Sequence, residues 1–252
     1  MRGGRTSIAR GALLPLALLG LLLVAACSRG PEPVASIDPG FVPIAAEIEA
    51  VPEVPLLTAA DVTEGSAIFI RIFKAEAELE VWGKAPTSDQ FALLRTFPIC
   101  AFSAELGPKL REGDRQSPEG FYRVRLGSLN PNSSYHLSFN LGYPNRYDRA
   151  HGRTGNYLMV HGNCVSIGCY AMTDAGIDEI YAMVETALNA GQDAVSVHIF
   201  PFRMSTANMV RHADNEWAEE WGMLKIGYDL FETTKKVPDV RVEGLDYAFT
   251  SG

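Results

Sequence analysis

Apolar and polar positions alternate along much of the chain between residues 66 and 160. The apolar positions are rich in β-branched and aromatic residues, which is typical of strands with one face buried. Glycine and proline interrupt the pattern, with a long connection around Gly107 and Gly113. The pattern predicts strands over residues 67–73, 79–82, 91–97, 121–126, 135–139 and 157–160.

The period changes after Cys169. Apolar residues now recur at helical spacing over residues 177–188. Thr173 or Asp174 can cap the start of this helix, and Gly191 can end it. A further strand is predicted over residues 195–200, and a second helix over residues 214–224, where Trp217 and Trp221 are expected in the core.

The first residues carry an export signal instead of a piece of the fold. Three arginines precede an apolar run over residues 13–24, which is too short for a comfortable membrane span. Residues 24–27, Val-Ala-Ala-Cys, resemble a bacterial lipobox, in which the peptide is cut before the cysteine and the thiol carries lipid. We therefore expect a signal peptide over residues 1–26 and lipidation at Cys27. The alternative is an ordinary signal peptide followed by an unmodified cysteine.

Three further segments follow. Residues 27–62 are rich in proline, alanine and acidic residues and are predicted to be a tether, with packing of part of it on the domain as the alternative. Residues 63–246 are predicted to form one domain, mainly β with helices in the C-terminal third, and residues 247–252 a tail. Ser28 is not aspartate, which by analogy with lipoprotein sorting favours a periplasmic protein anchored to the outer membrane.

Composition narrows the function classes. The 252 residues carry a formal net charge of −8, with 47% hydrophobic and 21% charged residues, as in an ordinary globular protein. The acidic balance argues against a nucleic-acid partner, because phosphates need a basic face. No CxxC or HxxxH spacing is present, so we predict no zinc site and no cofactor.

The remaining cysteines are Cys100, Cys164 and Cys169, an odd number in an exported chain. One disulfide at most can form within the chain, so one thiol is left over. Cys164 can be a free thiol or can pair with either of the other two. A Cys164–Cys169 disulfide would leave the chain without its candidate nucleophile until it was reduced.

The stretch over residues 158–170 combines His161, Cys169 and flexible small residues. A thiol attacks carbonyls as the thiolate, which needs a base or a positive local potential. We expect the helix N-terminus near Thr173 to favour the thiolate modestly, and the backbone around Gly168 to form an oxyanion hole. Cysteine peptidases, transpeptidases and thiol redox proteins all fit this composition, although the CxxC spacing of redox proteins is absent.

The order His161-Gly162, then Ser166-x-Gly168-Cys169, resembles the L,D-transpeptidase (YkuD-type) catalytic domain, and specifically its YafK-like branch. The resemblance runs from about Ile68 to about Asn208. It includes the segments 106–122, 139–148 and 197–204, the first with its pattern Gly113-Asp114 and Pro118-Glu119-Gly120. It implies a mixed β-sandwich or barrel-like fold.

The resemblance also implies roles for residues. Cys169 would attack a peptide carbonyl in a peptidoglycan stem and form a thioester, with His161 as general base and later general acid. Ser166 and Gly168 would shape the oxyanion region. An amine acceptor would give a cross-link or an attached wall lipoprotein, and water would give hydrolysis.

This sequence departs from the wider family at Ile167 and Ala171, where many members carry a histidine and an arginine, and the segment between His161 and Cys169 is shortened. Both features fit the YafK-like branch, but they make hydrolysis a rival to transfer. A non-catalytic wall-binding lipoprotein is the other alternative. The expected substrate contacts are Asn140, Tyr143, Arg153 and Arg203, with Asn145 as a further cleft candidate, His151 as a rival base and His198 as a core histidine.

Overall fold

The computed structural model describes residues 58–103, 105–250 and 252. The predicted signal peptide, Cys27 and most of the predicted tether lie outside these residues. The described part begins with a short 3₁₀ turn, η1 (Ala59–Asp61), which the side chain of Asp61 closes back onto Thr58. None of the described helices is long and apolar enough to cross a membrane.

One five-stranded sheet has the strand order β3-β2-β1-β10-β5. Its members are β1 (Ile68–Phe73), β2 (Glu78–Lys84), β3 (Phe91–Pro98), β5 (Gly120–Val124) and β10 (Val195–Phe200). Only β1 and β10 pair in parallel. Every residue of β1 is buried, as expected for a central strand with both faces covered.

A second five-stranded sheet has the order β4-β9-β8-β7-β6. It comprises β4 (Ala101–Phe102), β6 (Leu129–Ser133), β7 (His136–Asn140), β8 (Met159–His161) and β9 (Tyr170–Ala171), and the 3₁₀ turn η2 (Leu126–Ser128) precedes β6. The neighbours β8 and β9 run parallel. This sheet holds the stretch with His161 and Cys169 at its centre.

Four helices complete the described chain: α1 (Arg146–Ala150), α2 (Asp174–Asn189), α3 (Thr206–Arg211) and α4 (Ala218–Thr234). Thr173 caps α2 by accepting from the N–H of Gly176. The prediction of α2 is therefore met closely. By contrast, α4 begins later than predicted and continues to Thr234.

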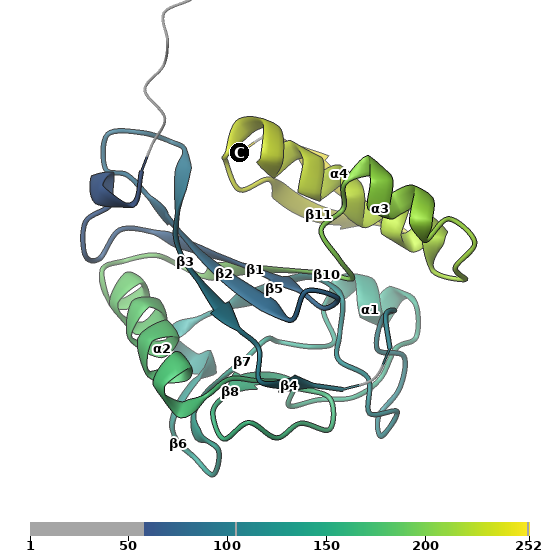
Figure 1. Cartoon of the computed structure of the whole chain (residues 1–252), viewed down its shortest axis with the longest axis horizontal. Helices are drawn as coiled ribbons and strands as arrows, with labels where there is room; N and C mark the ends of the chain where they lie inside the picture. The colour runs from purple at the N-terminus through teal and green to yellow at the C-terminus, as the bar shows by residue number, and fades with distance from the viewer. Residues whose placement is uncertain (1–57, 104, 251) are drawn as a thin grey trace, which may run out of the picture. The chain divides into compact units, whose positions relative to one another are not determined.

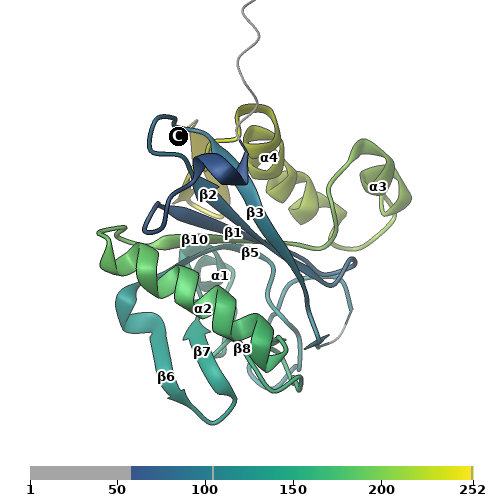
Figure 2. The ribbon, with the colours of Figure 1, turned by 60° about the vertical axis from the view of Figure 1, so that its left-hand side comes forward.

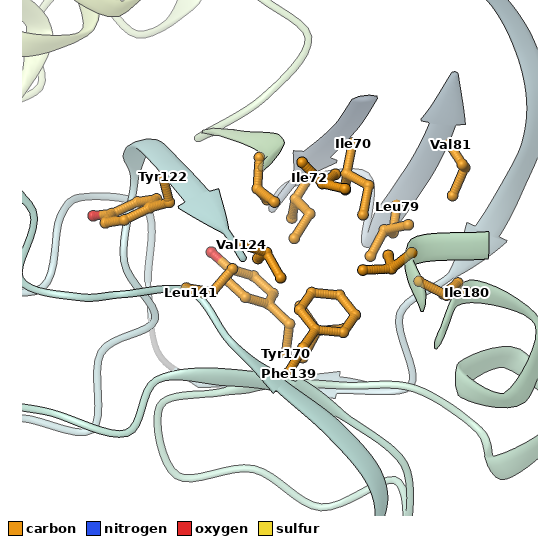
Figure 3. Packing of buried hydrophobic residues seen from close by; sticks show 14 of the residues in the cluster. Ile70, Ile72, Leu79, Val81, Tyr122, Val124, Phe139, Leu141, Tyr170 and Ile180 are labelled. Carbon is orange, nitrogen blue, oxygen red and sulfur yellow. The ribbon is translucent and has the colours of Figure 1, made fainter. Parts of the chain in front are cut away.

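The larger hydrophobic core fills the space between the two sheets and α2. Figure 3 shows Ile70, Leu79 and Val124 from the first sheet facing Phe139 and Tyr170 from the second. Figure 1 places α2 and the second sheet on one side of the first sheet, and α3, α4 and β11 on the other. Figure 2 shows α2 lying along both sheets. This arrangement confirms a mainly β fold with helices in the C-terminal third.

The other face of the first sheet is covered by the C-terminal elements. Trp221 and Leu224 of α4 pack with Phe73 and Phe200 in a second cluster. A hairpin of β11 (Asp239–Glu243) and β12 (Asp246–Thr250) follows α4. Residues assigned to the tail therefore belong to a strand, and Tyr247 is buried there.

Candidate active site

Strand register brings Cys169 and His161 onto one face of the second sheet. Val160 pairs with Tyr170, and His161 pairs with Ala171. Cys169, one residue before β9, therefore lies beside Met159. Because side chains two residues apart on a strand share a face, Cys169 lies on the same side as His161, opposite the core side chains of Val160 and Tyr170.

The ring of His161 is fixed in one tautomer. Its Nδ1–H donates to the carbonyl oxygen of Gly162 over 2.6 Å, which leaves Nε2 of the neutral ring unprotonated. The ring of Tyr135 packs against it with centroids 4.8 Å apart. Gly162 is required next to the histidine, because a Cβ there would lie 2.7 Å from Asp174 Oδ1.

The backbone of Cys169 is braced by two serines. Its carbonyl oxygen accepts from Ser166 Oγ over 2.7 Å and from Ser117 Oγ over 3.2 Å. Gly168 has a φ of +145°, in the region that favours glycine, and its N–H donates to Ser166 Oγ. That N–H is thus engaged within the chain. Ser166 and Gly168 hold the nucleophile in place, and their predicted part in an oxyanion hole stays a prediction.

The backbone N–H of Cys169 is a better candidate oxyanion donor. No acceptor for it occurs among the described residues. The thiol itself contacts the carbonyl oxygen of Tyr157 over 3.7 Å. Donor and nucleophile therefore belong to the same residue, as an oxyanion site close to the attacking atom requires.

Burial raises the pKa of the Cys169 thiol, although the backbone of Met159 and the charge of Lys109 oppose this rise. Burial lowers the pKa of His161, against its hydrogen bond to Gly162. The predicted effect of the helix N-terminus on the thiolate stays a prediction. The strand β9 separates Cys169 from the first turn of α2, and a helix end acts only at short range.

These two shifts predict the pH dependence of the reaction. A neutral His161 must accept the proton of a neutral thiol, so kcat/KM rises as His161 loses its proton. Because the pKa of His161 lies below its ordinary value of 6.5, we expect the acid limb of kcat/KM to have its midpoint below pH 6.5. In His161→Gln this limb should vanish, and the residual rate should climb only as the thiol ionises. An unchanged acid limb in that variant would contradict the role of His161.

The disulfide joins Cys100 to Cys164, with Cα atoms 5.1 Å apart, and leaves Cys169 free. Of the pairings left open by the sequence, this one keeps the candidate nucleophile reduced. Cys164 lies in the loop between His161 and Cys169, and Cys100 directly precedes β4. The bond therefore ties the active-site loop to the edge of the second sheet.

The segment 107–119 supports the same loop from the other side. Asp114 accepts from the N–H groups of Leu110, Arg111 and Gln116 and from Lys109 Nζ. These bonds close the segment into a fixed turn, which explains the aspartate of the sequence pattern. Ser117, in the same segment, then reaches the backbone of Cys169.

Two predicted substrate contacts have other partners in the structure. Arg153 is buried and forms ion pairs with Asp148 and Glu220. Arg203 pairs with Glu78 and Glu80 on the face of β2 turned away from the larger core. Both guanidinium groups are neutralised within the protein, so neither replaces the arginine missing at Ala171.

Two other candidates lie at the end of β7 and in the loop that follows it. Asn140 pairs with Met159 in the sheet and so shares the face of His161 and Cys169, while its Oδ1 accepts from Gly142 N. Tyr143 is buried, and its hydroxyl donates to the carbonyl of Lys109.

Three candidates serve the structure elsewhere. Asn145 caps α1. His151 lies at the C-terminal end of the same helix, and its Nδ1–H donates to the carbonyl oxygen of Tyr147. His198 is buried on β10, as expected for a core histidine.

Sequence reasoning missed three residues beside the catalytic pair. Ser138 pairs with His161 across β7 and β8, is fully buried, and its hydroxyl has no partner in the described part of the chain. Tyr135 covers the histidine ring, and Tyr157 presents its carbonyl to the thiol. Alternation in the strand 135–139 could have identified Ser138, but strand pairing is not visible in one sequence.

The described residues contain no group of three or more histidine, cysteine, aspartate or glutamate side chains that could hold a metal ion. The site combines a thiol, an imidazole and backbone amides on a β scaffold, which is typical of enzymes with a cysteine nucleophile.

Comparison with known proteins gives the family. Residues 86–199 match the L,D-transpeptidase catalytic domain, YkuD. Over 178 residues the chain is 53% identical to the Escherichia coli K12 protein named "Putative L,D-transpeptidase YafK", covering 71% of this chain and 72% of that protein. The same figures hold for the protein of that name from Escherichia coli O157:H7. The chain belongs to the L,D-transpeptidase family and is an enzyme of peptidoglycan.

Among solved structures, the chain is similar to two further proteins at lower identity. The helical cell shape determining protein Pgp2 from Campylobacter jejuni is 16% identical over 71% of this chain and 73% of that chain, with a TM-score of 0.44. A mutant of the same protein is matched over 58% of its length. Mycobacterium tuberculosis L,D-transpeptidase 1 is 14% identical over 53% of this chain and 62% of that chain, with a TM-score of 0.30.

Proposed function

We propose that Cys169 forms a thioester with a peptidoglycan stem peptide and then transfers the acyl group to an amine. The observation that carries the proposal is the shared face of Cys169 and His161, with Nδ1 of the histidine engaged and Nε2 left to act as a base. The fixed tautomer matters because a general base must present an unprotonated nitrogen.

The proton and electron balance is complete with these groups. His161 Nε2 takes the thiol proton as sulfur attacks the carbonyl carbon, and the developing oxyanion faces the N–H of Cys169. The imidazolium then gives its proton to the leaving amine as the C–N bond breaks. In the second half an amine acceptor loses its proton to His161, attacks the thioester and releases the thiol.

The surroundings of the thiol support a bulky acceptor. Ile167, Tyr157 and Val165 are exposed by 81%, 69% and 52%, although all three have large apolar side chains. Val165 and Ile167 lie in the loop directly before Cys169. The carbonyl oxygen of Tyr157 contacts the thiol. Apolar side chains next to a nucleophile are well placed to be covered by a bound substrate chain.

Hydrolysis is the second candidate function. It is favoured by the engagement of Arg153 and Arg203 in internal ion pairs. An acceptor that carries a carboxylate gains from a nearby arginine, whereas water needs none. Ala171 stands where many family members carry an arginine, and water as the acceptor does not need that arginine.

Product analysis tests the proposal and separates the two outcomes. The purified chain is incubated with tetrapeptide muropeptides, with and without an excess of an amine acceptor, and the products are analysed by mass spectrometry. We expect a covalent adduct that maps to Cys169 and joined products that grow with amine concentration. Released acid alone would favour the hydrolase, and the absence of both product and adduct would refute the proposed function.

We further propose that the chain is a periplasmic lipoprotein anchored through Cys27, with wall-attached lipoprotein as one acceptor. The support is the basic and apolar sequence before the Ala26-Cys27 junction. Labelling with a tagged fatty acid should mark the protein and should be lost in Cys27→Ser.

A further inference from the structure

A cavity lies on the first sheet, and Cys169 is not among the residues that line it. Its volume is about 460 Å³, and its lining includes His198 and Ser196 of β10 together with Phe121 and Arg123 of β5. These four residues form register pairs and therefore share a face. The larger core with Val197 and Ile199 occupies the opposite face, so the cavity faces away from the space between the two sheets.

The wall of the cavity contains a buried polar group without a partner. His198 is 2% exposed, and its Nδ1 has no hydrogen-bond partner in the described part of the chain. Burial, followed by the charge of Arg71, lowers the pKa of this histidine to about 3, so the ring is neutral at physiological pH. Buried polar atoms are nearly always paired, and a ligand entering the cavity would supply the missing partner.

The lining is rich in arginine. Arg123 comes from β5, and Arg146 and Arg149 come from α1. Arg146 makes no ion pair with any described residue, while Arg123 reaches Asp193 only over 3.5 Å. Asp239 also lines the cavity, but Arg241 already pairs with it over 2.8 Å. Three arginines and one aspartate therefore line the cavity, which leaves an excess of positive charge.

The remaining wall is apolar and comes from the C-terminal hairpin. Val237, Val240 and Val242 line the cavity and are half-buried. A bare inorganic anion would leave this surface uncovered, whereas a small organic molecule would bury it. The fitting ligand therefore combines a carbon skeleton with an anionic group for the arginines.

We propose that this cavity binds the carboxylate-bearing end of a short peptide. A planar guanidinium group matches a carboxylate in a two-point contact, and the valines would pack on the peptide's carbon chain. The further step, that the peptide is a second peptidoglycan stem, rests on the proposed function. The protein would then hold the wall at a site separate from the thiol that reacts with it.

The ring signals of His198 in NMR spectra of the full chain report on the cavity directly. They are identified by their loss in His198→Phe and, independently, as the histidine that stays neutral down to about pH 3. The probe is a synthetic stem tripeptide, and its fully amidated form is the control. We expect a saturable shift with the first and none with the second.

Arg146→Gln should weaken this binding about tenfold, because one charge-assisted hydrogen bond is lost. Arg211→Gln is the matched control, since Arg211 is exposed on α3 and does not line the cavity. An unshifted His198 signal would overturn the inference, as would an equal shift with the amidated peptide. An equal shift with inorganic phosphate or with vesicles of anionic phospholipid would also overturn it, in favour of a phosphate site.

The same samples separate this inference from the proposed function. A covalent adduct at Cys169 without any shift of His198 would reject the second site alone. A carboxylate-dependent shift without an adduct would keep the second site and reject the thioester mechanism.

Discussion

Cys169→Ala abolishes the covalent adduct with stem peptides and lowers turnover by at least about a thousandfold, because the described residues contain no other free thiol. Cys100 and Cys164 are joined in a disulfide, and Cys169 is the free cysteine of the described chain. The measurement is the intact mass of the protein after incubation with muropeptides, together with the rate of product formation.

The matched control is Cys100→Ala combined with Cys164→Ala, which removes the two disulfide-bonded cysteines of the described chain. We expect it to keep the adduct at Cys169 and to lose about 2–4 kcal/mol of unfolding free energy, as is typical for a disulfide. An adduct that persists in Cys169→Ala would assign the nucleophile to another group. If the adduct is absent from both variants, the reaction requires the loop that the disulfide holds, and the loss in Cys169→Ala does not by itself identify the nucleophile.

The fold was predictable where buried apolar residues follow or recur regularly over several positions of an element. The strands at residues 67–73 and 195–200 and the helix after Thr173 follow directly from their apolar period. The extension of α4 was not predictable in this way. Gly227 interrupts the pattern, yet a Cβ there would lie 2.7 Å from Phe249 and 2.8 Å from Phe121. The glycine permits close packing and does not end the helix.

The shortest strands and the C-terminal hairpin were missed for a different reason. β4 and β9 have two residues each, which is too few for any period to show. Tyr247 is buried only because it packs with Phe121 and Tyr147, which lie far away in the sequence. Such contacts depend on tertiary structure, so the end of the domain could not be read from local composition.

The catalytic pair was identified from residue type and order, but its electrostatics were not. The helix begins at Asp174, as its capping residues predicted, and its effect on the thiol stays a prediction. The burial that raises the pKa of the thiol depends on tertiary packing and could not be predicted from the sequence. The ion pairs of Arg153 and Arg203 were not predictable either, since an arginine in a sequence does not reveal the carboxylates of Asp148 and Glu78 that pair with it.

Glu119→Ala is expected to cost about 3–5 kcal/mol of unfolding free energy, because it leaves a buried lysine without its counter-charge. Lys74 and Glu119 are exposed by 0% and 1%, with Nζ and Oε1 2.9 Å apart. The same carboxylate accepts from Gly107 N over 2.7 Å and from Trp221 Nε1 over 2.8 Å. It thus ties the end of β1, the segment 107–119 and α4 together.

Urea unfolding followed by tryptophan fluorescence measures this loss as a lower midpoint at an unchanged slope. The control is the pair Lys74→Met with Glu119→Leu, which removes both charges and keeps the apolar volume. This double variant should recover much of the lost stability, since the buried lysine that penalises the single variant is gone. A double variant as unstable as Glu119→Ala would show that the bonds to Gly107 and Trp221 dominate.

Activity gives a second measure of the same network. Ser117, two residues before Glu119, donates to the backbone carbonyl of Cys169. If the segment loosens when its glutamate anchor is lost, the nucleophile loses one of its two serine braces. We therefore expect Glu119→Ala to lower kcat at temperatures where it is still fully folded, while Arg211→Gln, on an exposed helix face, changes neither kcat nor the urea midpoint. Full activity of folded Glu119→Ala would confine the network to stability and separate it from catalysis.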